Sequence, residues 1–159
     1  MRIIEASPYS EDAVQLMEEL SENLEAITGS SGRASFQPED VGVPGALFVI
    51  AYDDKGNAIG CGGYRPMEDN TAEVKRMYAR LKHVGVGTQV LEYLERKAAG
   101  FGYASLRLET RLINKEAVSF YVKRGYHRIE NYGKYMVMPE AVCFEKIVAA
   151  TGKESKNEG

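Results

Sequence analysis

The pattern of apolar and polar positions divides the chain into short strands and longer helices. Alternating or continuous apolar runs predict strands at 2–5, 46–52, 58–64, 72–79, 105–110, 126–129 and 141–146. Apolar residues three and four positions apart predict helices between Ser10 and Gly29, over 87–101, and between Asn114 and Gly125. This order predicts a mixed sheet covered by helices, with a strand–helix–strand crossover at its centre.

Turn and cap residues separate these predicted elements. Asp53 to Asn57 joins two apolar runs and is typical of a β-hairpin turn. Ser10 and Asn114 are suited to be helix N-caps, and Gly125 to end the last helix in a left-handed conformation. The polar stretch 31–45 contains two prolines, so we expect a loop there, alone or with a short helix near Pro38.

Length and charge limit the classes of protein that this chain can be. The 159 residues are 44% hydrophobic, which predicts one domain over 1–150, followed by a polar, disordered tail at 151–159. The net charge of −3 gives no general attraction to nucleic acid. No apolar run is long enough to cross a bilayer, and the first residues lack the apolar core of a secretory signal. We therefore expect a cytoplasmic protein with no nucleic-acid or membrane partner.

The cysteines and histidines show no pattern of a metal site or of a redox motif. Cys61 and Cys143 each lie in an apolar run without a CxxC spacing, which favours buried thiols in a reducing compartment. His83 and His127 are far apart and have no metal-ligand spacing around them. We expect no metal.

The most informative chemistry lies at the start of the second predicted helix, in the run Lys82-His83-Val84-Gly85-Val86-Gly87. No acidic residue occurs between Val74 and Leu91, although helices usually favour acids in their first turn. The same stretch holds the cations Lys75, Arg76, Arg80, Lys82 and His83. A helix start with free N–H groups and no acid of its own is suited to bind a pyrophosphate. The alternative is a tight strand-to-helix turn with two glycines.

Three phosphate-binding patterns can be compared with this run. The P-loop pattern GxxxxGK[ST] is absent, and the dinucleotide pattern GxGxxG lacks its third glycine after Gly87. The run Lys82-x-x-Gly85-x-Gly87 fits the pattern [Gln/Arg]-x-x-Gly-x-[Gly/Ala], with lysine at the first position.

A second motif follows in the order expected with the first. Asn114-x-x-Ala117-x-x-Phe120-Tyr121-x-x-x-Gly125-Tyr126 is similar to the NxxAxxFYxxxG[FY] helix of the GNAT superfamily of acyl-CoA-dependent N-acyltransferases. With both motifs present, the chain resembles this family over most of its length, most strongly from Glu73 to Tyr126. It departs from the family in having two fewer residues between Arg80 and the glycine turn.

The resemblance implies an α/β fold with a mixed, mostly antiparallel sheet of about six to seven strands flanked by about four helices. It also implies direct transfer of an acetyl group from acetyl-CoA to a primary amine of a small molecule, without a metal. The backbone of Met77, Tyr78 and Ala79 would bind the pantetheine arm. The pyrophosphate would contact a run of residues in the glycine turn: Lys82, His83, Val84, Gly85, Val86, Gly87 and Thr88. Asn114 and Tyr121 would complete the cofactor site, although Asn114 is equally suited to cap its helix alone.

Two acidic residues are candidates for the catalytic base. An alkyl amine has a pKa of about 10.4, so deprotonation at pH 7 costs roughly 4.6 kcal/mol and a base is useful. Glu73 matches by position the base of some family members and is the first candidate, unless it faces solvent or pairs with Lys75 or Arg76. Glu109, at the end of the next strand, is the second.

Tyr121 resembles the family tyrosine that hydrogen-bonds the departing sulfur. A phenol pKa of about 10 against a thiol pKa of about 8.5 makes full proton transfer from tyrosine to the thiolate unfavourable, so we expect this residue to stabilise developing charge. The alternative is an ordinary core aromatic residue beside Phe120.

The acceptor is expected against the first helix, residues 30–44 and residues 130–139. Cations and tyrosines in or near these segments would suit an amine that also bears a carboxylate or phosphate: Arg33, Arg65, Asn131, Tyr132, Lys134 and Tyr135. A protein N-terminus, a polyamine or an aminoglycoside is also a possible acceptor. A polyamine or an aminoglycoside would suit an acidic pocket, to which Glu22, Glu25 and Glu39 could contribute. Two competing hypotheses are an acyl-CoA-binding module without turnover and a nucleotide-binding protein; a homodimer is possible.

Overall fold

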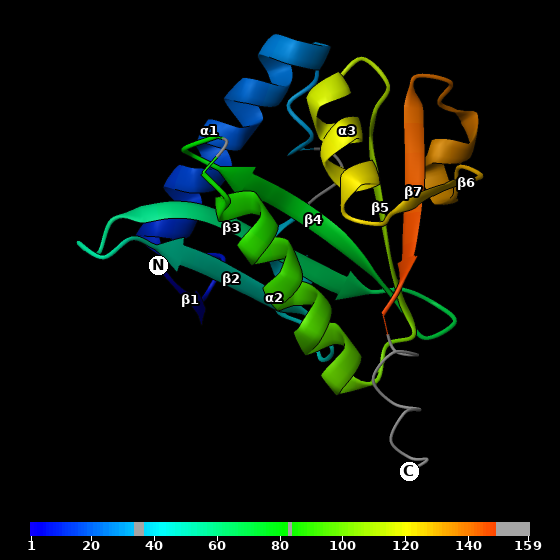
Figure 1. Cartoon of the computed structure of the whole chain (residues 1–159). Coiled ribbons are helices and arrows are strands. Elements are labelled where there is room, and N and C mark those ends of the chain that lie inside the picture. Colours follow the sequence, from blue (N-terminus) through cyan, green and yellow to red (C-terminus); the bar gives the residue numbers. More distant parts are fainter. Residues whose placement is uncertain (34–36, 83, 149–159) are drawn as a thin grey trace.

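The computed structural model describes residues 1–33, 37–82 and 84–148 (Figure 1). Its strands are β1 (Arg2–Glu5), β2 (Leu47–Tyr52), β3 (Ala58–Pro66), β4 (Thr71–Ala79), β5 (Ser105–Arg111), β6 (His127–Ile129) and β7 (Ala141–Ile147). Its helices are α1 (Glu11–Thr28), α2 (Val86–Phe101) and α3 (Lys115–Lys123), with short 3₁₀ helices η2 (Pro38–Val41) and η3 (Gly133–Val137). Every predicted strand and helix is present in the predicted order, which confirms the pattern analysis.

The number of helices is the main difference from the expected fold. The described residues contain three α-helices and two 3₁₀ helices, against about four expected helices. The short helix expected near Pro38 is η2. It begins with Pro38, because proline favours the first position of a helix. The sequence did not predict η3, because one turn is too short to show a helical period.

One seven-stranded sheet in the order β1-β2-β3-β4-β5-β7-β6 organises the molecule. All neighbouring strands are antiparallel except β4 and β5, which are parallel. Helix α2 makes the crossover between these two strands. The sheet is therefore mixed and mostly antiparallel, as expected.

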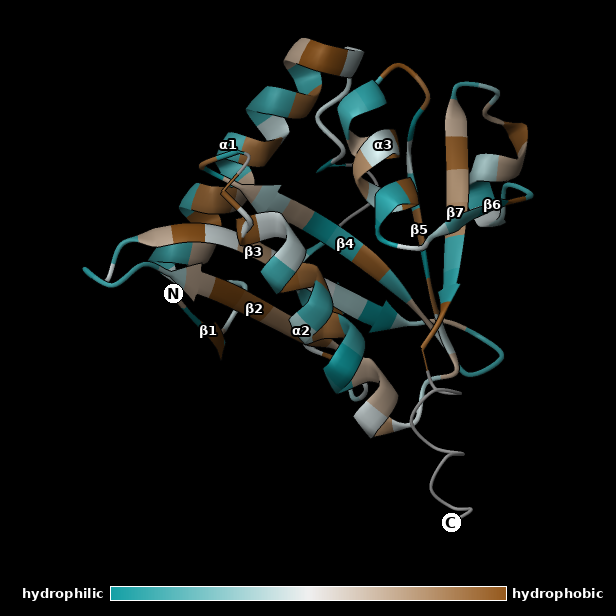
Figure 2. Cartoon of the chain, viewed as in Figure 1, coloured by the Kyte–Doolittle hydropathy of each residue, from teal (hydrophilic) through white to brown (hydrophobic). Residues whose placement is uncertain are grey.

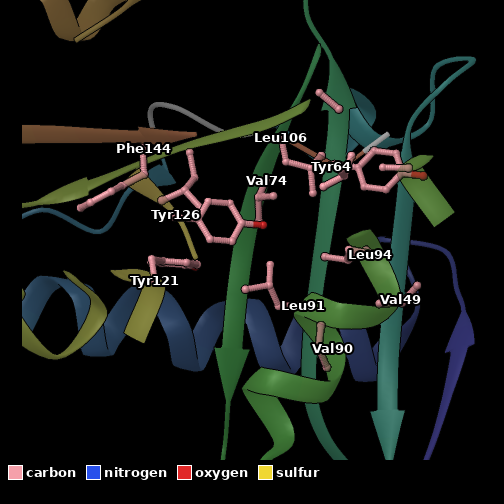
Figure 3. Close-up of a cluster of buried hydrophobic side chains, with 14 of the residues drawn as sticks. Val49, Tyr64, Val74, Val90, Leu91, Leu94, Leu106, Tyr121, Tyr126 and Phe144 are labelled. Atoms are coloured by element: carbon pink, nitrogen blue, oxygen red, sulfur yellow. The ribbon is translucent and has the colours of Figure 1, made fainter. Parts of the chain in front are cut away.

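Helices cover both faces of the sheet. Because side chains alternate between the faces along each strand, neighbouring residues of one strand pack against different helices. Val49 of β2 lies in the core under α2 and α3, which also holds Leu91 and Tyr121 (Figure 3). Its neighbour Ile50 packs with Leu16 of α1 on the other face. Buried on both sides, β2 is coloured as an almost continuous hydrophobic stretch in Figure 2.

Strands β4 and β5 separate along their length. They pair only from Thr71 opposite Ser105 to Glu73 opposite Arg107, after which β5 continues along β7 alone. Along 74–79 the edge of β4 that faces β5 therefore has no strand partner in the part of the chain that the structure describes. Its other edge, towards β3, contains a bulge at Arg76, whose φ is 58°. This separation opens the middle of the sheet.

Cys61 and Cys143 are both free and fully buried. Each lies in an apolar core cluster, and burial raises the pKa of both thiols. The prediction that they are small buried hydrophobic residues is confirmed.

Candidate active site

A cavity of about 470 Å³ occupies the opening between β4 and β5. Its helical half is formed by the turn before α2, the first turn of α2, and α3. Its strand half is formed by α1, by Lys75 of β4, and by the end of β5 from Glu109 to Arg111. The backbone of β4 runs between the two halves. One cavity thus connects the two faces of the sheet.

The start of α2 presents free backbone N–H groups to the helical half. Gly85 is the N-cap residue with a φ of 87°, which glycine adopts at little cost, and no side chain caps this helix. The first turn contains no acidic residue. A Cβ on Gly87 would lie 3.3 Å from the Phe120 ring, so glycine also allows α3 to pack closely. The geometry is that of an anion site on a helix N-terminus.

Among the described residues, the cations Arg124 and Lys82 flank this helix start. The Arg124 guanidinium donates to Thr88 Oγ1 at 2.9 and 2.5 Å and lies 4.1 Å over the Phe120 ring. Lys82 Nζ lies 3.1 Å from Glu116 of α3, and both side chains are more than half exposed. Arg124 is thus fixed in place, whereas the ion pair of Lys82 with Glu116 is exposed and contributes little to stability.

Helix α3 brings two predicted residues to the cavity. The Asn114 side chain accepts a hydrogen bond from the Ala117 N–H at 3.3 Å and so caps the helix, while also lining the cavity. Tyr121 is 8% exposed and packs edge-on against Tyr126 (Figure 3). Among the described residues its hydroxyl has no hydrogen-bond partner. Burial raises the pKa of Tyr121, so it remains a protonated donor.

The strand half contains a buried carboxylate with neighbouring cations. Glu109 lines the cavity and is bonded to the guanidinium of Arg111. Burial raises the pKa of the Glu109 carboxyl, and Arg111 opposes that change. Lys75 is 9% exposed and donates to the Tyr135 hydroxyl at 3.0 Å; burial lowers the pKa of its ammonium.

Glu73 lies beneath this surface and does not line the cavity. Its side chain is 1% exposed and accepts hydrogen bonds from Arg65 Nε at 3.0 Å and from the Tyr132 hydroxyl at 2.7 Å, and Arg65 Nη2 forms an ion pair with it at 2.9 Å. Lys75 Nζ is 3.6 Å away. Glu73 therefore pairs with Lys75, as the alternative interpretation expected. Its hydrogen bond with Tyr132 also joins the segment before η3 to the sheet.

Most of the predicted cofactor residues line one cavity: Met77, Tyr78, Ala79, Lys82, Gly85, Gly87, Thr88, Asn114 and Tyr121. Val84 and Val86 do not line it. Val84 is 61% exposed, and the side chain of Val86 is buried in the core. His83 lies outside the described residues.

Arg124 and Arg111 also line the cavity, although the sequence motifs did not predict them as site residues. Ala117 and Phe120 of α3 and its C-cap residue Arg124 are three and four positions apart, so all three face the cavity; the sequence does contain this signal. Arg111 has no such signal, because its position depends on where β5 separates from β4.

The residues expected around the acceptor have different surroundings. Arg33 is exposed and forms an ion pair with Glu18. The Asn131 amide donates to three backbone carbonyls, which fixes the loop around η3. Three acidic side chains that could have formed an acidic pocket are exposed and do not line the cavity: Glu22, Glu25 and Glu39.

Two features are absent from residues 1–33, 37–82 and 84–148. No group of three or more His, Cys, Asp or Glu side chains that could hold a metal occurs within them. Within the same ranges, no helix is both long enough and apolar enough to span a membrane.

Known proteins share this sequence and fold. An "IAA acetyltransferase" from Azospirillum brasilense is 29% identical over 147 residues, covering 91% of this chain and 95% of that protein. A Klebsiella pneumoniae protein assigned as an acyl-CoA N-acyltransferase has a similar structure, with a TM-score of 0.78, 24% identity, and coverage of 92% and 97%. PaiA N-acetyltransferase from Thermoplasma acidophilum, solved in complex with coenzyme A, has a TM-score of 0.66 at 20% identity, with coverage of 92% and 99%.

The family model of the acetyltransferase (GNAT) family matches residues 13–126, which span α1 to the end of the second motif. The match covers the opened pair β4 and β5, the glycine turn and α3, and so includes most of the cavity walls. The chain therefore belongs to the GNAT family and is an acyl-CoA-dependent N-acyltransferase.

Proposed function

We propose that this enzyme transfers an acetyl group from acetyl-CoA directly to the primary amine of a small molecule, with both substrates bound together. The observation that supports this most is the single cavity that passes between β4 and β5. It has an anion site in its helical half and a buried carboxylate in its strand half. A small molecule fits a cavity of about 470 Å³ better than a folded protein surface does.

Acetyl-CoA fits the helical half for two physical reasons. Its diphosphate would accept hydrogen bonds from the N–H groups between Gly85 and Thr88, with Arg124 and Lys82 adding positive charge. Its pantetheine arm would lie along the unpaired edge of β4 at Met77 to Ala79, where the backbone lacks a strand partner among the described residues. The thioester supplies an activated acyl carbon.

Glu109 is the better candidate for the base that accepts a proton from the attacking amine. It lines the cavity, and its raised pKa brings it closer to neutral pH, where a base works best. Glu73 is held by Arg65 and Tyr132 away from the cavity lining. We therefore propose that Glu73 positions the neighbouring strand and Tyr132, while Glu109 touches the substrate.

Tyr121 would stabilise the negative charge that develops on the sulfur as the carbon–sulfur bond breaks. It lines the cavity, lacks a hydrogen-bond partner among the described residues and stays protonated because burial raises its pKa. Backbone N–H groups of β4 would stabilise charge on the thioester oxygen in the same region.

A thiol-release assay tests the function. The purified protein is mixed with acetyl-CoA and a panel of primary amines, and free CoA and the acetylated amine are measured by thiol reagent and mass spectrometry. At least one small amine should give equal amounts of both products. CoA binding without thiol release from any amine would contradict the proposal and favour a binding module.

Tyr121→Phe tests the role of the hydroxyl, with Tyr126→Phe as the matched control. Tyr126 lies in the same aromatic cluster, but its hydroxyl donates to Glu95 at 2.8 Å and does not line the cavity. Tyr121→Phe should lower kcat by about 100-fold with little change in the KM for acetyl-CoA. Tyr126→Phe should lower thermal stability and leave kcat within a few-fold. Unchanged kcat in Tyr121→Phe would exclude its proposed role.

A further inference from the structure

Among the described residues, more cations than carboxylates line the strand half of the cavity. Lys75, Arg76 and Arg111 line it, against one carboxylate, Glu109. Behind this surface, Glu73 and Asp40 pair with Arg65 and do not line the cavity. An anionic ligand would therefore balance the charge at this end of the cavity.

Lys75 has a donor left for such a ligand. Its ammonium has three N–H groups, of which one points to Tyr135 at 3.0 Å and another faces Glu73 at 3.6 Å. No third partner occurs within the described parts of the chain, although the side chain is 9% exposed and lines the cavity. A buried ammonium with an unused donor is costly unless something pairs with it.

The arrangement of the charges suits a zwitterion. Lys75 on β4 and Arg111 on β5 stand on the two separating strands, and Glu109 is two residues before Arg111 on the same strand. Residues two apart on a strand lie on the same face. One carboxylate next to two cations is complementary to an amino group next to a carboxylate.

The opposite wall of the strand half is largely apolar. Leu20, Leu24 and Ile27 of α1 line it, with Asn23 and Thr28 at its polar edge. These three residues follow a three- and four-residue spacing, so they form one stripe on the helix. A hydrocarbon side chain would bury apolar surface there. A polyamine or an aminoglycoside would find one carboxylate in this half among the described residues, Glu109.

We propose that the acceptor is an amino acid with an apolar side chain, which rests on the proposed acetyl transfer. Lys75 and Arg111 bind its carboxylate, Glu109 faces its amino group, and the α1 stripe contacts its side chain. The neutral amine nitrogen forms the new bond to the acetyl carbon and one of its protons goes to Glu109. The carbon–sulfur bond breaks, and CoA leaves as a thiolate that Tyr121 stabilises and that then takes a proton from solvent.

Matched acceptors test this assignment on the wild-type enzyme. Leucine and phenylalanine are compared with their amides and with 3-methylbutylamine and phenethylamine in the thiol-release assay. The amino acids should have a kcat/KM at least about 30-fold higher, because the others lack the charged partner of Lys75 and Arg111. The amides have less basic amines and so more free base at neutral pH, which means that intrinsic reactivity cannot explain the expected preference.

Lys75→Met, with Lys97→Met as the control, tests the residue. Lys97 is on the exposed side of α2, where it pairs with Glu5 far from the cavity lining. Lys75→Met should raise the KM for leucine by about 30-fold, leave the KM for acetyl-CoA unchanged and remove the preference for acid over amide. A merely structural role would slow all acceptors equally. If Lys75→Met does not fold, Arg111→Gln gives the same comparison.

The outcomes separate this proposal from the function on which it rests. Turnover of neutral amines at the rate of the amino acids would overturn the acceptor class and leave the acetyl transfer intact. Thiol release from no amine at all would overturn both. A preference for acids that Lys75→Met and Arg111→Gln leave unchanged would also overturn the assignment of the carboxylate site.

Discussion

The helical and strand halves of the cavity are built in different ways. In the helical half the cavity is lined mainly by the start of α2 and by side chains from 114–124, so much of it follows from local chain conformation. In the strand half Glu109 pairs with the nearby Arg111, but the surrounding network joins distant parts of the chain: Lys75 bonds Tyr135, 60 residues on, and Tyr132 bonds Glu73, 59 residues back. The first half depends more on local conformation, and the second more on tertiary packing.

The two halves should therefore differ in how they respond to substitution. A site made of backbone depends on glycine and on where a helix begins, so few substitutions are tolerated without loss. A site made of long-range side-chain pairs can be altered by exchanging charges on β4, β5 or η3 while the sheet remains intact. We therefore expect the two halves to respond separately to mutation, and the following experiments test that separation.

The largest effect should come from Gly87→Asp in the helical half. The new carboxylate places a negative charge in the first turn of α2, where it favours the helix but repels a diphosphate. We expect the Kd for CoA to rise at least about 100-fold, with no loss of thermal stability beyond that of the matched control Gly87→Asn, which has the same shape. Calorimetric titration and thermal unfolding measure both. CoA binding that is equal in the two variants would place the diphosphate elsewhere.

Glu109→Gln should remove activity from the strand half without changing CoA binding. Burial raises the pKa of Glu109, and a base acts only when deprotonated, so the wild-type kcat/KM should rise with pH through that raised pKa and then level off. In the variant only free amine can react, so the rate should keep rising towards the amine pKa of about 10. The deficit should be about 100-fold at neutral pH and smaller at pH 9.

A pH–rate profile of both proteins distinguishes the candidate bases. If Glu109→Gln retains the wild-type profile, Glu109 is not the base. The same profile for Glu73→Gln then shows whether Glu73 performs that role through an ordered water.

The smallest effect on catalysis should come from Glu73→Gln, which should mainly lower the free energy of unfolding. Removing this charge leaves Arg65 and the buried Lys75 without their shared carboxylate, and breaking such a buried pair costs about 3 kcal/mol. We expect denaturant unfolding at lower concentration, an unchanged Kd for CoA, and a kcat within about 10-fold of wild type at a temperature where the variant is folded. An unchanged unfolding midpoint would contradict a structural role for Glu73.

Sequence patterns predicted much of the fold because most of its signals are local. Ser10 does cap α1, Asn114 caps α3, and Gly125 has a φ of 94° after α3, as their positions in the chain indicate. The order of strands and helices follows from apolar periodicity in the same way. The segment η3 was missed, since its burial depends on Tyr135 packing against Cys143 of β7.

The candidate site divides along the same line. The glycine turn and Tyr121 were predicted from two motifs, and both line the cavity. The choice between Glu73 and Glu109 could not be made from sequence, because both alternate to the same side of adjacent strands. The point at which β4 and β5 separate decides between them. Glu73 lies before it and is covered by Arg65 and Tyr132, whereas Glu109 lies beyond it and faces the cavity.

The sequence by itself determined that α2 begins without an acidic residue in its first turn and that α3 carries Tyr121. These two motifs were enough to indicate the family. These depend on hydrogen bonds and side-chain spacing within a few residues. The tertiary structure alone decided which charges meet in the strand half, because Lys75, Glu109, Arg111 and Tyr135 come together only when the sheet opens and η3 packs on it. Electrostatic and burial effects depend on distance in space, and distance along the chain does not specify them.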